Sequence, residues 1–98
     1  MGKIMKIFIK ALVDGDIILE EVDASSIQGF TDCALVHLEK RWVVYDTPTG
    51  LLIVYGRTKQ ETLEKLNEKK FQMEQARNTQ LYQKRIQEFE QLKEMHKP

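Results

Sequence analysis

Cysteine and histidine are the first residues of this sequence to consider for chemistry, because a thiolate and an imidazole can bind a metal ion together. Cys33 and His37 are four residues apart, and on a helix this spacing would place them on one face. The residues around them are rich in Val and Leu, which favours a strand, where four residues span about 13 Å. This distance is too long for shared coordination, so we expect structural roles for both residues and no metal site.

Two carboxylates flank a glycine at Asp14 and Asp16, and such a pair could hold a cation. A calcium loop needs further oxygen ligands at alternate positions and a distal glutamate. The apolar residues 17–19 that follow do not supply them. Asp and Gly both tolerate positive φ, so this segment predicts a hairpin turn rather than a cation site.

Aromatic and basic residues lie together at Lys40, Arg41, Trp42 and Tyr45. Bases stack on aromatic rings while cations hold phosphates, so this group could form a nucleic-acid platform. Core packing of Trp42 and cross-strand pairing of Tyr45 explain the same residues with fewer assumptions, and we expect Trp42 to be buried. Nucleic-acid binding stays as the alternative function.

The composition is that of one small soluble domain. The chain has 98 residues, 42% of them apolar and 31% charged, with a formal net charge of +0. The sequence contains no Gly-rich phosphate loop, paired cysteine motif or nucleophile elbow, so we expect no enzyme, no catalytic residue and no cofactor. The single cysteine and the absence of long apolar runs predict a cytoplasmic protein with no signal peptide or membrane segment.

Residues 1–57 are expected to form an antiparallel β-meander of four to five strands. Apolar residues alternate with lysines over 5–13, and turns are predicted at 14–16 and at 47–50, where Gly15 and Gly50 are turn glycines. Segments 33–38, 41–47 and 51–55 are rich in β-branched and aromatic residues, as strands are. Residues 23–32 predict a loop or a short helix.

Residues 58–98 predict one long C-terminal helix and so an α+β fold with a single domain. Thr58 and Glu61 form a capping box, in which Glu61 would accept from the backbone N–H of Thr58. The segment has no glycine and no internal proline. A helix of this length is about 55 Å long and exceeds its own sheet, so the first half is expected to pack on the sheet and the second half to project.

The second half of this helix carries an apolar stripe that covers about half of its circumference. An exposed stripe of this kind implies a partner surface, either in a homodimer or on another protein. A break at Asn78-Thr79 is a competing interpretation, because it would let the distal helix fold back on the proximal one. The predicted partner or dimer contacts are Leu81, Tyr82, Ile86, Phe89, Leu92 and Met95.

Residues 37–61 carry a pattern of single residues at fixed spacing. The pattern resembles that of small uncharacterised bacteriophage and prophage proteins, and it consists of His37, Trp42, Val44, Thr49, Gly50, Gly56, Thr58 and Glu61. The resemblance implies an origin in a mobile element. Small phage proteins often bind a host protein stoichiometrically, as anti-CRISPR and other anti-defence inhibitors do. We therefore predict a protein–protein interaction module without catalysis, whose partner is itself or a host protein, without a membrane.

Overall fold

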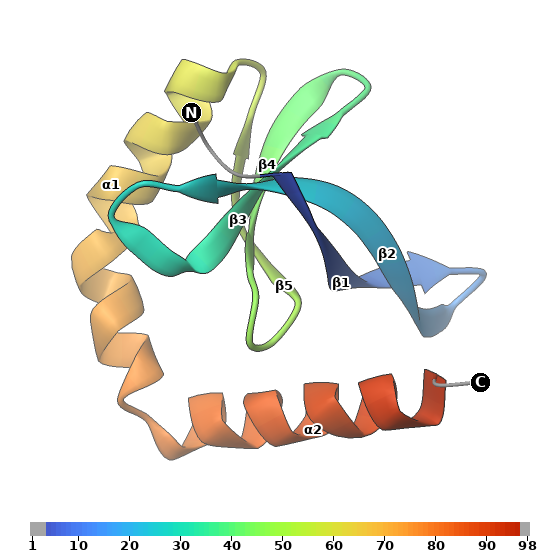
Figure 1. Ribbon diagram of the computed structural model, residues 1–98. Coiled ribbons are helices and arrows are strands. Elements are labelled where there is room, and N and C mark those ends of the chain that lie inside the picture. The colour runs from blue at the N-terminus through green and yellow to red at the C-terminus, as the bar shows by residue number, and fades with distance from the viewer. Residues whose placement is uncertain (1–3, 97–98) are drawn as a thin grey trace.

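The computed structural model describes residues 4–96, except for the side chains of residues 11–13 and 96. Five strands are followed by two helices (Figure 1). The elements are β1 (Ile4–Val13), β2 (Asp16–Ile27), β3 (Phe30–Leu38), β4 (Arg41–Asp46), β5 (Leu51–Gly56), α1 (Lys59–Arg77) and α2 (Gln80–His96). The strands form one antiparallel sheet in the order β1-β2-β3-β4-β5, so the predicted α+β class and the five-stranded meander are confirmed.

The first hairpin turn has the geometry that its residues favour. Asp14 and Gly15 have φ values of 51° and 85°, and Val13 pairs directly with Asp16 across them. Positive φ at both central residues matches the right-handed twist of the flanking strands. The predicted alternation of apolar residues holds for Ile9, which is buried, whereas the side chains of Ala11 and Val13 lie outside the described residues.

The prediction of a loop or short helix over residues 23–32 is wrong. β2 continues to Ile27 and β3 begins at Phe30, with a turn at Gln28-Gly29 between them. Val22 is half-buried, Asp23 is exposed and Ala24 is buried, so the period of two continues to Ala24, and the small polar residues after it pair with neighbouring strands although they do not look like a strand. Gly29 adopts a φ of 85°, which lets the chain reverse there.

Apolar residues cover both faces of the sheet. On one face, Ala34, Val36, Val43 and Tyr45 pack with Ile9 and Ala24 from the first two strands. The first strand also reaches the opposite end of the meander, because the backbone N–H of Lys10 donates to the carbonyl of Gly50 at 3.2 Å. Figure 1 shows the strong twist of the sheet, in which β1 and β2 run across the direction of β4 and β5. This face is therefore covered largely by the sheet itself.

The opposite face is covered by α1. Cys33, Leu35, Val44 and Val54 form a second apolar cluster with Leu66 of α1. The helix begins at its predicted cap, where the hydroxyl of Thr58 accepts from the backbone N–H of Glu61 at 3.1 Å. The carboxylate of Glu61 accepts from the backbone N–H of Arg57 at 3.0 Å, one residue before the expected donor.

The prediction of one long C-terminal helix is wrong, because the helix ends at Arg77 and a second one begins at Gln80. Thr79 separates them: its hydroxyl donates to the carbonyl of Ala76 at 2.7 Å and accepts from the backbone N–H of Tyr82 at 3.2 Å. One threonine thus caps the end of α1 and the start of α2. The second helix neither continues along α1 nor folds back on it, but crosses below the sheet (Figure 1).

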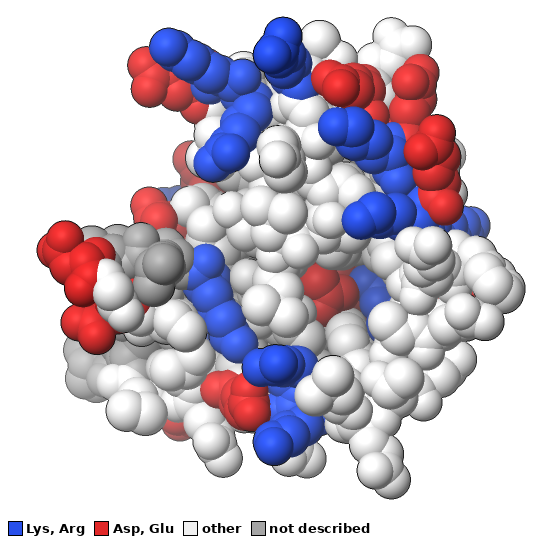
Figure 2. Space-filling view, turned by 180° about the vertical axis from the view of Figure 1, so that it is seen from behind, with Lys and Arg blue, Asp and Glu red and all other residues white. Residues whose placement is uncertain are grey.

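Trp42 is half-buried rather than buried, and its ring stacks on His37 with 3.8 Å between centroids and 3° between planes. Figure 2 shows the molecule from behind, where a largely uncharged area in the middle is bordered by charged side chains. Within residues 4–96, neither helix is long and apolar enough to cross a membrane.

Candidate functional site

The six residues of the predicted apolar stripe have different environments in the structure. Phe89 is 1% exposed and Tyr82 is half-buried against the sheet, so both are taken up by contacts within the chain. Ile86 and Leu92 are also half-buried. Leu81 and Met95 remain 60% and 82% exposed. The inner side of the stripe therefore covers the end of its own sheet, and its outer side is open.

Phe89 packs directly on the backbone of Gly50. A Cβ atom at position 50 would lie 2.5 Å from Cε1 of Phe89, which is far closer than two carbon atoms can approach. The φ of Gly50 is +70°, so glycine is required there for its backbone conformation as well. The amino group of Lys93 lies 4.9 Å from the centroid of the Phe89 ring and covers its outer side. The sequence identifies Gly50 as a turn glycine but does not show that an aromatic ring covers it.

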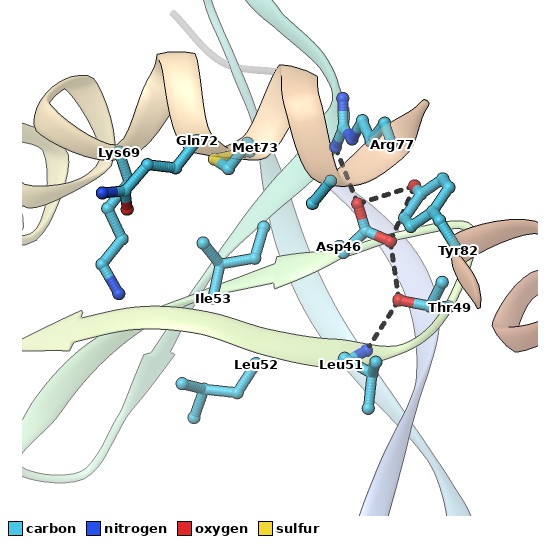
Figure 3. Close-up of a pocket in the computed structure, with 11 residues that line it drawn as sticks. Asp46, Thr49, Leu51, Leu52, Ile53, Lys69, Gln72, Met73, Arg77 and Tyr82 are labelled. Carbon is cyan, nitrogen blue, oxygen red and sulfur yellow. Dashed lines mark hydrogen bonds and ion pairs between the residues drawn. The ribbon is translucent and has the colours of Figure 1, made fainter. Parts of the chain in front are cut away.

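Asp46, at the end of β4, is the centre of a polar cluster that joins the sheet to both helices (Figure 3). Its side chain is buried and accepts from the Arg77 guanidinium at 2.7 Å, the Tyr82 hydroxyl at 3.0 Å and the Thr49 hydroxyl at 2.6 Å. Arg77 ends α1 and Tyr82 lies in the first turn of α2. The cluster therefore fixes the angle between the two helices.

The protonation of this cluster favours a structural role over a chemical one. Burial and the hydrogen bond to Asp46 raise the pKa of Tyr82 to about 12, so its hydroxyl stays a donor at neutral pH. Burial acts to lower the pKa of Arg77, but the hydrogen bond and charge of Asp46 outweigh it and raise that pKa. Burial also raises the pKa of the Cys33 thiol, which disfavours the reactive thiolate. We interpret the cluster as a clamp on the helices.

A groove runs between α1 and β5, next to this cluster. It consists of three adjoining pockets of about 300, 280 and 310 Å³. The first and second share Leu52, Ile53 and Lys69, and the second and third share Tyr55 and Lys65. The groove therefore follows β5 over its whole length, and we refer to it as the α1–β5 groove.

One end of the α1–β5 groove is apolar and the other is charged. At the apolar end, Met73 of α1 faces Ile53 of β5, whereas the side chain of Leu52 points away from α1 on the other side of the strand (Figure 3). Figure 3 shows Lys69 reaching down from α1 toward the strand beside this apolar pocket. At the other end, the pocket is lined mostly by charged residues, together with Tyr55 and Gly56: Lys40, Arg41, Arg57, Glu61 and Lys65.

The strand that borders the groove is the last in the sheet. β5 pairs only with β4, and its pairing has a register shift that leaves Ile53 without a partner opposite it. The side chains of Leu51, Leu52 and Tyr55 are 40%, 46% and 53% exposed. The edge therefore presents exposed apolar side chains beside main-chain groups that pair with no further strand of the described sheet. Such an edge is typical of a binding surface, and it is also prone to aggregation.

The sequence gives little sign of this groove. The interleaved Lys and Glu residues of α1 are typical of a solvated helix face, and the periodicity of residues 51–55 does not say whether the strand is central or at an edge. Of the two aromatic residues of the alternative nucleic-acid platform, Tyr45 lies in the core, and Trp42 is half-buried and stacks on His37. Among the described residues, no group of three or more His, Cys, Asp or Glu could hold a metal ion.

The chain has no match among family models, curated proteins or solved structures. A functional assignment therefore depends on the geometry of the described surfaces. Two surfaces are candidates: the α1–β5 groove and the outer side of α2 with Leu81 and Met95. The groove is the stronger candidate because it combines a hollow, an open strand edge and a defined distribution of charge.

Proposed function

We propose that this protein acts by binding another protein through the α1–β5 groove, without catalysis. The observation that carries the proposal is the exposed apolar edge of the sheet at Leu51, Leu52 and Tyr55, directly beside a hollow lined by α1. Burial of one leucine side chain in an interface contributes about 1.5 to 3 kcal/mol. Two leucines and one tyrosine on one open edge supply a substantial part of the free energy of a specific complex.

The clamp around Asp46 supports this proposal because it makes the groove rigid. Arg77 holds the C-terminal end of α1 against β4, and Tyr82 holds the first turn of α2 there. Asp46, Arg77 and Tyr82 also line the apolar pocket. A preformed groove loses little conformational entropy on binding. The same residues that stabilise the fold would thus keep the binding surface ready for its partner.

The outer side of α2 is the second surface proposed for protein contact, in line with the predicted stripe. Leu81 and Met95 are the two members of that stripe with large exposed areas. A homodimer through α2 and a host protein in the α1–β5 groove are compatible, since they use different surfaces. The resemblance to phage proteins, and the anti-defence role that it would imply, stay predictions.

Site-specific photocrosslinking in the source cell tests the proposal. A photoreactive phenylalanine analogue is placed at Leu52 on the exposed strand edge that borders the groove, at Leu81 on α2, and at the exposed Gln91 as the control. We expect a discrete adduct with another protein from position 52 and none from position 91. Adducts with nucleic acid, adducts from position 81 alone, or no adduct at all would each contradict the groove as the binding surface.

A further inference from the structure

We propose that the partner of the α1–β5 groove is an extended acidic and apolar peptide segment, which adds to the sheet as a sixth strand beside β5. This inference rests on the proposed function, because it names the occupant of the same groove. Three features of the groove support it: the open main chain of β5, the excess of positive charge and the apolar pocket at one end.

β5 is the last strand of the sheet, so within residues 4–96 the main-chain groups on its outer side pair with no strand. The carbonyl of Tyr55 accepts from the amino group of Lys65 at 3.0 Å, so this carbonyl faces α1 and the groove. In an antiparallel strand, alternate residues direct their main-chain groups to the same side, and in β5 the register shift at Ile53 interrupts this alternation once. An incoming strand would replace Lys65 as the donor to Tyr55, and would release the amino group of Lys65 to pair with an acidic side chain.

The charges that line the groove favour an acidic occupant. The acidic members are only Asp46, Glu61 and Glu68, whereas the basic members are Lys40, Arg41, Arg57, Lys65, Lys69 and Arg77. Asp46 is already held by Arg77, and Glu61 lies 3.5 Å from Lys65. Within residues 4–96, Lys40, Arg57 and Lys69 make no ion pair. These cations would meet carboxylates of the partner, which increases the association rate and the specificity.

The apolar pocket and the length of the strand define the size of the occupant. The pocket of about 300 Å³ at Leu51, Ile53 and Met73 lies at the low end of ligand-pocket volumes and suits one large apolar side chain. β5 has six residues, so a paired segment would extend over about 20 Å. We therefore infer a segment of about six residues, with an apolar anchor at one end and carboxylates toward the other.

A library of random octapeptides displayed on yeast, screened against the full chain, tests this inference. We expect selected peptides to be rich in Asp, Glu and β-branched residues and free of central proline. Binding of a synthetic selected peptide is then measured by fluorescence anisotropy against wild type and Lys69→Glu. The variant is expected to bind at least tenfold more weakly, while Lys84→Glu, an exposed lysine of α2 outside the groove, should change the affinity less than twofold.

N-methylation of successive peptide residues provides the second measurement. A strand that pairs on one edge uses alternate N–H groups, so methylation should weaken binding at every second position only. Uniform effects, equal affinities of Lys69→Glu and Lys84→Glu, selection of basic peptides, or no selected peptide would each overturn the inference. The proposed function fails separately, when photocrosslinking at Leu52 yields no protein adduct. An adduct there without strand-like peptide binding means that the partner docks in another form.

Discussion

The guanidinium of Arg77 donates to Oδ1 of Asp46 at 2.7 Å, although the two residues are 31 positions apart in the chain. Asp46 is 5% exposed, and the pair links the last residue of α1 to the last residue of β4. Removal of one partner from such a pair leaves the other charge buried and unpaired. The resulting loss of stability is much larger than the difference in stability between the intact pair and apolar residues of similar volume. The clamp is therefore the most vulnerable polar contact of the described fold.

Replacement of Arg77 by alanine should lower the free energy of unfolding by about 3 kcal/mol, because the Asp46 carboxylate would lose its charged partner. This value is at the low end of the range for buried pairs, since the Arg77 side chain is 25% exposed. Urea denaturation measures the change. Arg85→Ala is the matched control: Arg85 and Glu88 form an exposed pair at 3.5 Å, and its loss should cost less than about 0.5 kcal/mol. Equal costs for the two variants would show that the clamp does not stabilise the fold.

Gly50→Ala should be much more destabilising than Gly29→Ala, although both glycines have positive φ. Each alanine carries the same kind of backbone strain, of about 1 kcal/mol. Only the Cβ atom at position 50 would collide with Phe89, since no atom lies within 4 Å of a Cβ at position 29. We expect an additional loss of about 1 to 3 kcal/mol in Gly50→Ala by thermal and urea denaturation. Similar losses in both variants would place the ring of Phe89 elsewhere.

Tyr82→Phe should reduce stability at neutral pH and remove a pH dependence at alkaline pH. The pKa of Tyr82 is raised from its ordinary value near 10 to about 12, so folding favours the protonated phenol. Its contribution is present below pH 10 and is lost as the pH rises from 10 to 12. The difference in unfolding free energy between wild type and Tyr82→Phe should be about 1 to 2 kcal/mol at pH 8 and should shrink over this interval. A constant difference from pH 8 to 12 would exclude the hydrogen bond to Asp46.

Leu52→Asp should abolish partner binding without unfolding the protein. The side chain of Leu52 is 46% exposed at the edge of the sheet, so a carboxylate there stays solvated and should change stability by less than about 1 kcal/mol. The same charge would repel acidic groups of a partner and remove apolar contact area. Yield of the crosslinked adduct from a second groove position, Tyr55, measures binding. Undiminished yield in a folded Leu52→Asp variant would place the interface outside the groove.

Local signals made the strand order predictable. Asp14-Gly15 and Thr47–Gly50 connect apolar segments through short turns, so consecutive strands pair as neighbours and the meander follows. The capping role of Thr58 was equally local. The segment 23–32 escaped prediction because Ser25 and Ser26 have low strand propensity, and only pairing with β1 and β3 holds them extended.

Contacts between distant residues were not predictable in the same way. Thr79 is a good cap, but the sequence does not set the direction that α2 takes after it. That direction depends on the Asp46 cluster and on Phe89 above Gly50, which join segments 31 to 39 positions apart. The stripe of α2 was visible from its periodicity, but whether its own sheet or another molecule would cover it depended on this turn. The α1–β5 groove has the same origin, since it exists only where the helix and the sheet edge meet.

The burial of Cys33 provides an intrinsic probe of local opening. Cys33 is 1% exposed, and its sulfur lies 3.5 Å from the Arg77 guanidinium at the end of α1. A thiol reagent can reach this atom only when the end of α1 moves away from the sheet, so the alkylation rate in native buffer reports how often the clamp releases. If release requires only undocking of the helices, the rate should exceed that of global unfolding and should fall when a partner occupies the groove. The single thiol thus allows the motion of the helices to be timed at a native residue, without an engineered labelling position.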